Sequence, residues 1–531
     1  MIKVTARQLL SLSIALFLIS LPQPGHTQYV PGQILVRLHP SASKPTATTF
    51  GHLANQYGIL SMEPLYETPI RRAKPAEIGR FSHLYRIRIT GNPEEAAHAF
   101  SNAPNVIYAQ PNHIFRPQQA PNDPRFSSQQ NLTTIHWQTL ADALGPVQKQ
   151  ITVAIIDSGI DYTHEDLAPN IWTNVQEANG QPGVDDDNNG YIDDIRGWDF
   201  THAPDLPGRG DYLHPDNDPM DESGHGTHVA GIIGAEANNG LGIAGIAPNA
   251  QLMALRAGLS LQSGATFLEE DDLAAAILYA VDNGAHIINM SWGGPERSFL
   301  ITDALHFASE NGLLLIAAAG NSGEVGIVSP AARNITIAVG ATDRNDRLAS
   351  FSTIGASLDL TAPGVNILST QPGNAYTSRS GSSFAVPHIS GLSALLLSRF
   401  PDLTPQQIRT RLVNATADLG FPGWDFTFGA GRIDAAALAA LTDPPPVVQI
   451  LSPDSGDASH TAFDIVAKAS GASLTTYRLS WGFGQIPQSW TVLQTGAPSE
   501  VITFRWPVDA LQDTTLVLRL EADLVNGRTL E

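Results

Sequence analysis

The middle of the chain alternates between short apolar runs and longer stretches whose apolar residues have helical spacing. The short runs are rich in β-branched residues, as is typical of buried strands, and lie at residues 151–156, 251–256, 286–290, 313–318 and 335–340. Helical stretches separate several of them, at residues 269–282, 299–311 and 384–399. This alternation predicts a three-layer α/β domain over residues 119–441, with a parallel sheet covered by helices on both faces. In such a sheet, sites form at the carboxyl ends of strands and at helix N-termini.

The segment before this domain has a different pattern. Residues 29–118 contain a short apolar run at 34–38, an alternating strand pattern at 84–89 and a helical stretch that starts at Pro93. Proline is well suited to the first turn of a helix. We therefore expect a small α+β domain here, followed by a proline- and glutamine-rich linker around residues 115–124.

After the α/β domain the pattern changes to strands only. Residues 442–446 end in three prolines, which predicts a stiff linker. Alternating runs separated by turn residues then follow, as expected for an all-β antiparallel sandwich over residues 447–531. The last residues resemble a turn followed by an unfinished strand, so we expect this β-sandwich module to be truncated.

The first 28 residues have the pattern of a secretory signal peptide. Lys3 and Arg7 precede a run of 13 residues, 9–21, that contains only apolar residues and serine. A helix needs about 20 apolar residues to cross a bilayer. The run is shorter than that, so a cleaved signal is favoured over a retained anchor. We expect a secreted, extracellular mature protein, with or without cell-surface association, and with no membrane span.

Composition narrows the chemistry. The 531 residues carry a formal net charge of −21 and include no cysteine. The negative charge argues against nucleic acid as a partner, because phosphate binding needs a basic surface. Without cysteine there are no disulfides, no thiolate metal sites and no thiol nucleophile. Any nucleophile must therefore be an oxygen or an amine.

Three polar residues lie in glycine-flanked, otherwise apolar settings. Asp157 follows the predicted strand 151–156 directly, where a carboxylate points into a site, although a lone aspartate here also fits a helix cap. Ser383 follows Gly381 and Ser382 where a helix begins, so its backbone N–H could stabilise an oxyanion. A Gly-Ser-Ser string by itself also fits a helix cap.

His225 is the third of these residues and starts the string His-Gly-Thr-His-Val-Ala-Gly at 225–231. A helix N-terminus disfavours imidazolium, so we expect a neutral ring that acts as a base near neutral pH. His225 and His228 could instead ligate a metal, but no third histidine or cysteine ligand lies nearby. We interpret His228 as a packed structural histidine.

The combination carries more weight than each motif. Aspartate, histidine, serine is one of the chain orders known for a charge-oriented nucleophile. The string Ile-Ile-Asp-Ser-Gly-Ile at 155–160, the histidine string and the serine block at 381–391 together resemble the subtilisin-like protease (subtilase) family. The resemblance spans about residues 121–440. It implies a subtilisin-like fold for the α/β domain.

The resemblance also implies a reaction. Asp157 would orient His225, His225 would take the proton of Ser383, and Ser383 would attack the scissile carbonyl to form an acyl-enzyme. Asn321, in Ala-Ala-Gly-Asn-Ser at 318–322, would donate its side-chain amide to the oxyanion. The expected enzyme is a serine endopeptidase that acts on protein or peptide substrates.

Substrate-binding residues follow from the same resemblance. Ser291, Trp292 and Gly293 come after the predicted strand 286–290 and match the segment on which an extended peptide adds by backbone hydrogen bonds. Gly320 and Val328 fall near the primary specificity pocket. The apolar Val328 favours hydrophobic or broad specificity.

Two positions depart from the family pattern. Ser382 stands where threonine is usual and Phe384 where methionine is usual. Serine keeps the hydroxyl, and phenylalanine keeps an apolar wall without an oxidisable thioether. These changes put rate and pocket shape in doubt, while the reaction type is unaffected.

An acidic string at 185–194 predicts a structural calcium site. Asp185, Asp187, Asn189, the Tyr191 carbonyl and Asp193 follow the spacing of a calcium loop. Arg196 stands where an EF-hand has its glutamate, so the loop is not an EF-hand. We expect Ca²⁺ here in preference to a solvated acidic loop, because such repulsion is hard to hold without a cation.

A second calcium site is implied by the resemblance alone. The positions that match calcium ligands of subtilases are Asp123, Asp166 and Asn239, with the carbonyls of Ala237, Leu241 and Ile243. Both sites would be structural, so removal of the metal should affect stability before chemistry.

The N-terminal segment also acquires a role from the resemblance. Residues 29–118 are similar to an inhibitor propeptide, which would act as an intramolecular inhibitor and folding aid until it is cleaved. Two alternatives remain: a catalytically silent descendant that acts as a scaffold, and a calcium-dependent adhesion protein dominated by its sandwich. A lipase or esterase is disfavoured because no Gly-x-Ser-x-Gly elbow surrounds Ser383.

Overall fold

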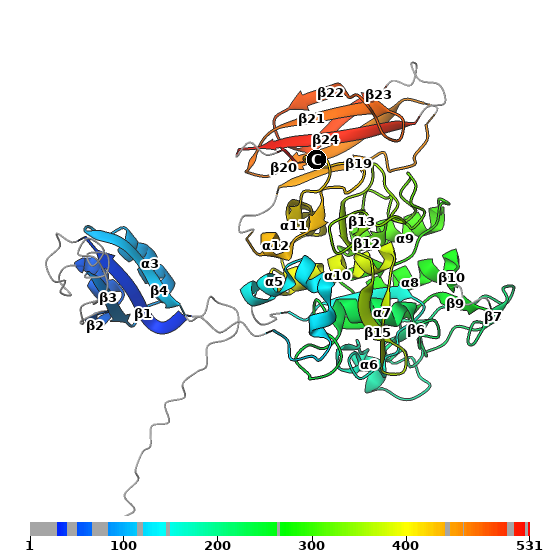
Figure 1. The fold of residues 1–531 in the computed structure, drawn as a ribbon, viewed down its shortest axis with the longest axis horizontal. Helices are drawn as coiled ribbons and strands as arrows, with labels where there is room; N and C mark the ends of the chain where they lie inside the picture. Colours follow the sequence, from blue (N-terminus) through cyan, green and yellow to red (C-terminus); the bar gives the residue numbers. More distant parts are fainter. Residues whose placement is uncertain are drawn as a thin grey trace, which may run out of the picture. The chain divides into compact units, whose positions relative to one another are not determined.

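The computed structural model (Figure 1) describes residues 29–39, 50–65, 83–113, 120–144, 149–262, 266–440, 446–459, 461–506, 515–525 and 529–530. The predicted signal peptide and nearly all of the predicted linker 442–446 lie outside the described residues. By its internal contacts the chain divides into two units, Met1–Gln119 and Ala120–Glu531. Among the described residues, no helix combines the length and apolar character that crossing a bilayer requires.

The N-terminal unit is a small α+β fold. Its antiparallel sheet has the order β2-β3-β1-β4, with β1 at Tyr29–Leu38, β2 at Ile59–Pro64, β3 at Leu84–Ile89 and β4 at Val106–His113. Helices α1 (His52–Gln56) and α3 (Pro93–Ser101) accompany it. Alternate strand residues such as Ile34 and Ile87 pack against Phe100 of α3 in its core. The predicted α+β class of this segment is therefore correct.

The second unit is built on a nine-stranded sheet with the order β17-β18-β14-β13-β12-β11-β5-β8-β6. All neighbours from β18 to β6 are parallel, and only the edge strand β17 is antiparallel. The bounds are β5 Thr152–Asp157, β6 Gly197–Asp199, β8 Gln251–Arg256, β11 Ile287–Met290, β12 Leu314–Ala318, β13 Thr336–Thr342, β14 Leu360–Pro363, β17 Thr416–Ala417 and β18 Arg432–Ile433. Each of the five predicted strands is present within two residues of its expected bounds.

Helices cover both faces of this sheet, as expected. Ile155 faces a core formed with α7 (His225–Gly234) and α10 (Ser382–Arg399), whereas its neighbour Ile156 faces a core formed with α8 (Glu270–Asp282) and α9 (Phe299–Glu310). This alternation explains why the strands read as continuous apolar runs. The shorter helices are α4 Gln130–Thr134, α5 Trp137–Leu144, α6 Val175–Ala178, α11 Pro405–Asn414 and α12 Ala435–Ala440, with 3-10 turns at Phe126–Ser128 and Ala168–Asn170.

Two small sheets flank the main one. Strands β15 (Ile367–Gln371) and β16 (Ala375–Arg379) form a hairpin just before α10. Strands β7 (Gly208–Arg209), β9 (Gly258–Leu261) and β10 (Thr266–Leu268) form a three-stranded sheet. Sequence periodicity did not reveal these strands, because most are too short or too polar to carry a pattern.

The C-terminal part of the same unit consists of two antiparallel sheets, as predicted. Their orders are β19-β20-β23 and β22-β21-β24-β25. The bounds are β19 Val447–Ser452, β20 Phe463–Ser470, β21 Leu474–Phe483, β22 Thr491–Gly496, β23 Ser499–Trp506, β24 Leu516–Leu524 and β25 Thr529–Leu530. Inward-facing residues of both sheets, among them Ile465 and Leu479, share one core.

The sandwich contacts the α/β part through the turn after β19. Asp454 accepts a hydrogen bond from the backbone N–H of Asn334 (2.7 Å) and forms an ion pair with Arg333 (3.2 Å). Arg297 pairs with Asp457 nearby at 2.6 Å. Arg333 is almost fully buried, so this contact is part of the packed interior of the unit.

Candidate active site

Polar groups gather at the carboxyl ends of three adjacent strands. Asp157 is the last residue of β5, Ser291 follows β11 and Asn321 follows β12 after a short turn. The order β12-β11-β5 and the pairing of Met290 with both Ile156 and Ala317 place these ends side by side. This is the edge at which a site is expected in a parallel sheet.

His225 begins helix α7 and faces Asp157. Its Nδ1 lies 2.7 Å from Asp157 Oδ1, and because an ionised carboxylate only accepts, the proton is on Nδ1. The same carboxylate oxygen accepts a hydrogen bond from the Ser158 N–H (2.8 Å), and Asp157 is 3% exposed. Asp157 therefore holds the ring in the tautomer that leaves Nε2 free to act as a base.

The pKa of His225 is raised, which differs from the expectation based on the helix N-terminus. Burial of the imidazole lowers this pKa, but the charge of Asp157 and its hydrogen bond outweigh burial. Because the dipole of the first turn is a partial charge, it is weaker than a full carboxylate at 2.7 Å. The ring is thus a stronger base than the sequence argument predicted.

Asp221 organises the turn before His225, and sequence reasoning missed it. Its Oδ1 accepts from Ser158 Oγ (2.9 Å) and from the N–H groups of Ser223 and Gly224 (2.8 Å each). Its Oδ2 accepts from the N–H and the hydroxyl of Thr227 (2.9 and 2.6 Å). Asp221 therefore ties the start of α7 to the residue after Asp157. A capping aspartate before a helical histidine was the available signal.

Ser383 lies in the first turn of α10 and is half-buried. The Phe384 ring is 5.2 Å from the His225 ring and 4.5 Å from that of His228, centroid to centroid. Ser291 Oγ donates to the Ser383 carbonyl at 2.8 Å. The start of α10 is thus anchored to the end of β11 and packed against the start of α7.

Asn321 is oriented by the turn that precedes Ser383. Its Oδ1 accepts a hydrogen bond from the Ser382 N–H at 2.8 Å. A Cβ built on Gly381 would lie 3.8 Å from Asn321 Nδ2, so the amide nitrogen faces the same turn. Within the described residues Nδ2 has no hydrogen-bond partner of its own. It is therefore available to an oxygen held beside Ser383.

His228 does not share a metal with His225. It is fully buried, burial lowers its pKa to about 3, and its Nε2 lies 3.3 Å from the Thr377 carbonyl. The groups of potential metal ligands found among the described residues do not include either histidine. His228 is a packed histidine, as interpreted from the sequence.

Two of the predicted substrate-binding residues, Gly293 and Gly320, lie against Val328. A Cβ built on Gly293 would lie 2.7 Å from Val328 Cγ2, and one built on Gly320 would lie 3.0 Å from Val328 Cγ1. Gly294 and Ser329 exchange two backbone hydrogen bonds of 2.9 Å. Trp292 faces back into the sheet, because its Nε1 donates to the Ile156 carbonyl at 3.0 Å. The apolar wall predicted at Val328 therefore lies between two glycine backbones.

The acidic loop closes around Glu177, which the sequence argument did not include. Carboxylate oxygens of Glu177, Asp185 and Asp187 all lie within 4.8 Å of one another. Glu177 also accepts from the N–H groups of Asp186 (2.6 Å) and Asp193 (2.9 Å). The Asp193 carboxylate instead accepts from the Gly183 N–H (2.7 Å), so its side chain is not part of this group. The oxygen-only donors fit Ca²⁺.

Asn189 lies inside the same loop. Its N–H donates to Asp185 and Asp187 (3.1 Å each), and its Oδ1 accepts from the Tyr191 N–H at 2.8 Å. Its Nδ2 donates to Asp194 at 2.9 Å. The amide therefore holds the loop closed in this structure.

The second predicted calcium set also meets in one place. Asp123 accepts from the Asn239 N–H (3.2 Å), and Asp166 accepts from Asn239 Nδ2 (2.8 Å) and the Ile243 N–H (2.9 Å). Both aspartates are buried, and burial raises the pKa of Asp166. The loop that carries Ala237 and Leu241 thus wraps two buried carboxylates.

A further acidic group is partly compensated by a buried arginine. Carboxylates of Asp199, Asp211 and Asp216 gather within 4.8 Å. Arg256, 2% exposed, pairs with Asp199 at 2.9 Å and with Glu222 at 3.1 Å. Burial raises the pKa of Asp199 to about 7 in spite of Arg256.

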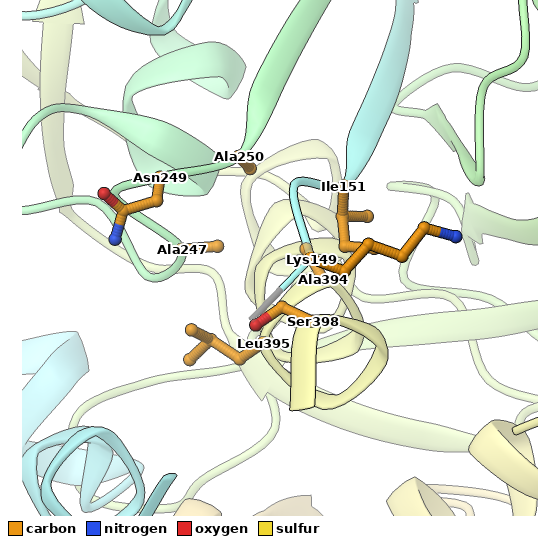
Figure 2. A pocket seen from close by; sticks show the side chains of 8 residues that line it. All are labelled: Lys149, Ile151, Ala247, Asn249, Ala250, Ala394, Leu395 and Ser398. Atoms are coloured by element: carbon orange, nitrogen blue, oxygen red, sulfur yellow. The ribbon is translucent and has the colours of Figure 1, made fainter. Parts of the chain in front are cut away.

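The small hollow in Figure 2 is far from these residues in the fold. It lies where the chain enters β5 and where α10 ends, and its lining includes Ile151, Ala394 and Ser398. Its free space of about 10 Å³ is enough for roughly one water molecule. A groove of about 1290 Å³ between the sandwich and the α/β part is lined by Trp424, Trp490 and Trp506, and by none of Asp157, His225 and Ser383.

Comparison with known proteins places this geometry in a family. The model of the subtilase family (peptidase S8) matches residues 148–431, more than half of the chain. The thermophilic serine proteinase of Bacillus sp. (strain AK1) is 38% identical over 325 residues, which cover 60% of this chain and 70% of that protein. Subtilisin Savinase of Lederbergia lenta is 41% identical over 239 residues, 45% of this chain and 86% of that protein.

A solved structure agrees with these relatives. A protease from Pseudoalteromonas arctica superposes with a TM-score of 0.50 at 29% identity, covering 61% of this chain and 99% of that one. The parallel sheet, the order of the three motifs and the sequence matches all point to one assignment. The chain belongs to the subtilase family and is a subtilisin-like serine protease.

Proposed function

We propose that Asp157, His225, Ser383 and Asn321 carry out peptide-bond hydrolysis in this chain. The observation that carries the proposal is the 2.7 Å contact of His225 Nδ1 with the buried Asp157, beside the start of α10. It leaves Nε2 as the basic nitrogen, and the ring of Phe384, the residue after Ser383, lies 5.2 Å from the His225 ring, centroid to centroid.

The proposed reaction has two halves. His225 Nε2 takes the Ser383 proton as Ser383 Oγ bonds to the scissile carbonyl carbon, and Asp157 stabilises the imidazolium that forms. His225 then gives that proton to the leaving amine as the C–N bond breaks. In the second half a water loses its proton to His225 and attacks the acyl-enzyme, and the proton returns to Ser383 as the acid leaves.

Asn321 would act on the charge that develops during both halves. Its Oδ1 is held by the Ser382 N–H, so Nδ2 is turned toward the turn before Ser383 without further rearrangement. A donor that is oriented before the reaction costs no reorganisation in the transition state. The Ser383 N–H at the start of α10 is the expected second donor.

The acyl half of the substrate would bind between Ser291–Gly293 and Gly320. The glycines expose backbone to which an extended peptide can hydrogen-bond, and Val328 supplies an apolar wall. We therefore propose hydrophobic or broad specificity for the residue before the cleaved bond.

A fluorophosphonate probe tests this proposal against a catalytically silent scaffold. The probe should modify Ser383 alone, and peptide mapping should find the label on the segment that contains it. Labelling should disappear in Ser383→Ala and persist in the neighbouring Ser382→Ala, whose buried hydroxyl has no hydrogen-bond partner among the described residues. Unlabelled, well-folded protein would support the silent scaffold.

We also propose two structural calcium sites. Glu177, Asp185 and Asp187 would hold one ion, with Asn189, Tyr191 and Asp193 completing the loop, and none of these carboxylates is paired with lysine or arginine in the described part of the chain. Asp123, Asp166 and Asn239, with the carbonyls of Ala237, Leu241 and Ile243, would hold the other. A bound cation would supply the charge that these carboxylates lack.

The N-terminal unit is proposed to be a propeptide, and residues 1–28 a secretory signal. The separation of Met1–Gln119 as a unit of its own contacts supports a removable segment. Added in trans to the mature enzyme, purified residues 29–118 should inhibit peptide hydrolysis. No inhibition at micromolar concentration would count against this role. An adhesion protein instead predicts surface binding that survives Ser383→Ala.

A further inference from the structure

Arg379, the last residue of β16, is a half-buried cation without a carboxylate partner among the described residues. Arg409, which is also half-buried, pairs with Asp359 at 2.7 Å, and the buried Arg333 and Arg432 pair with Asp454 and Asp346 at 3.2 and 2.7 Å. Leaving a partly desolvated charge unpaired costs free energy. An unpaired guanidinium therefore calls for a functional explanation.

The Arg379 side chain is held beside the turn that presents His225. Its Nη2 donates to Gln371 Oε1 at 2.9 Å, across the β15–β16 hairpin. A Cβ built on Gly224 would lie 3.1 Å from Arg379 Nη2 and 2.2 Å from Gln371 Nε2. Gly224 has φ 81°, so both space and backbone conformation require glycine there. The guanidinium is thus oriented next to the residue that precedes the catalytic base.

The hairpin that carries Arg379 packs on the helix that begins at His225. Ser369 and Thr370 of β15 donate hydrogen bonds to carbonyls of α7. The acyl-binding segments instead approach Ser383 from β11 and β12, through the Ser291 contact. In the proposed reaction His225 protonates the leaving amine, so we expect the substrate residues that follow the cleaved bond to lie near the hairpin that packs on its helix.

We propose that Arg379 is a specificity residue that binds a carboxylate in the leaving-group half of the substrate. Peptides with aspartate or glutamate at the first or second position after the cleaved bond should be preferred. The inference rests on the proposed function. A guanidinium can bind a carboxylate through two parallel hydrogen bonds, and Gln371 fixes its orientation. The net charge of −21 repels acidic peptides in general, so a preference for them must come from a local cation.

Arg379 also opposes the charges that favour protonated His225. Asp157 from β5 and Asp221 from the preceding turn raise the pKa of His225, whereas Arg379 lowers it. Arg379 likewise lowers the pKa of His228, the other titratable group of this helix face. Removal of the guanidinium should therefore shift the acid limb of the pH–rate profile upward. A purely structural role for Arg379 would not produce both this shift and a change in specificity.

The test uses quenched peptides with one acyl half and aspartate, asparagine or lysine at the first or second position after the cleaved bond. For the mature wild-type enzyme we expect kcat/KM for aspartate to exceed that for asparagine by roughly three- to tenfold at low salt, because the pair is partly exposed. The ratio should fall as salt screens the pair. In Arg379→Gln the ratio should approach one, and Arg379→Lys should retain part of it.

Arg399→Gln is the matched control. It removes the same charge from the C-terminal end of α10, 16 residues after Ser383 and therefore about 24 Å from Ser383 at 1.5 Å per residue. This variant should keep the wild-type ratio. Rates are normalised to fluorophosphonate-labelled enzyme, so partial misfolding of a variant does not change the ratio. A wild-type ratio of one, or a ratio that survives Arg379→Gln, overturns the inference. If the enzyme is labelled by the probe and cleaves the peptides without a preference for aspartate, only the inference about Arg379 is wrong. If the enzyme is neither labelled nor able to cleave the peptides, the proposed function is wrong.

Discussion

Two acidic regions of this protein differ in what balances their carboxylates. At the carboxyl edge of the sheet, Asp157 faces His225 at 2.7 Å and the Ser158 N–H at 2.8 Å. In the loop of residues 177–194, Glu177, Asp185 and Asp187 approach within 4.8 Å of one another with no basic side chain paired to them in the described structure. The carboxylate of the first region is satisfied by hydrogen bonds from its neighbours, while the clustered carboxylates of the second lack a cation.

Because of this difference, we expect one region to determine the catalytic rate and the other to determine the stability of the fold. A carboxylate whose partner is an ionisable ring can stabilise charge that appears during a reaction. A set of like charges can only be stabilised by an added ion, and the free energy of ion binding then becomes folding free energy. Substitutions at the sheet edge should therefore reduce turnover with little loss of stability. Changes in the acidic loop should do the reverse.

Removal of the nucleophile or the base should have the largest effect. Ser383→Ala or His225→Ala should lower kcat by about 10⁶-fold, the magnitude known for these losses in subtilisin, and the double variant should be little worse, because the residues act as a unit. Single-turnover assays measure the rate of the chemical step, and thermal melting measures the stability of each variant. A large drop in melting temperature with Ser383→Ala would break the proposed separation.

Loss of the oxyanion donor comes next. Asn321→Ala should lower kcat by about 10²–10³-fold, again the magnitude known for this donor in subtilisin, with KM almost unchanged. Asn321→Asp keeps an oxygen for the Ser382 N–H but replaces the Nδ2 donor with a carboxylate oxygen, whose negative charge should lower kcat at least as much as Asn321→Ala. If Asn321→Asp retained near wild-type kcat, Asn321 would be a positioning residue only.

Calcium removal should act on stability. At calcium concentrations about 100 times the Kd, an ion contributes about 2.7 kcal/mol, so loss of one ion should lower the melting temperature of the unit Ala120–Glu531 by roughly 3 °C. At temperatures well below the unfolding transition, chelation should leave kcat unchanged. Asp185→Asn with Asp187→Asn should reproduce part of the drop and reduce the response to EDTA, because the site at Asp123 and Asp166 is kept, while Asp303→Asn on the exposed side of α9 should do neither. Equal melting with calcium and EDTA would contradict the site.

The pH dependence should show the smallest effect. Catalysis needs neutral His225, and the net result of burial and Asp157 is a pKa above the usual 6.5, so kcat/KM should rise with pH through an apparent pKa above 6.5. Asp157→Asn removes the charge that outweighs burial and should move this limb to lower pH as it lowers kcat. A limb that stays in place would show that Asp157 does not set the basicity of His225.

Much of the fold was predictable because local pattern and burial agree. Strands 151–156 and 313–318 are buried on both faces, so their apolar runs are continuous and mark the sheet without any tertiary information. Short strands such as β6 and β14 have too few residues to show a period. Their place in the sheet is decided by pairing with β8 and β13.

The sequence by itself determined the reaction type, because Asp157, His225, Ser383 and Asn321 each lie in a local motif whose order and residue types specify acyl transfer. Only the tertiary structure decided what surrounds them. Glu177 joins Asp185, Asp221 ties Ser158 to Thr227, and Arg379 lies beside Gly224, all by contacts between segments that no local pattern connects. The same holds for the basicity of His225, since a carboxylate from another strand outweighs the local effect of the helix N-terminus. Electrostatic energies depend on distances in space, and distances between remote segments are set by packing.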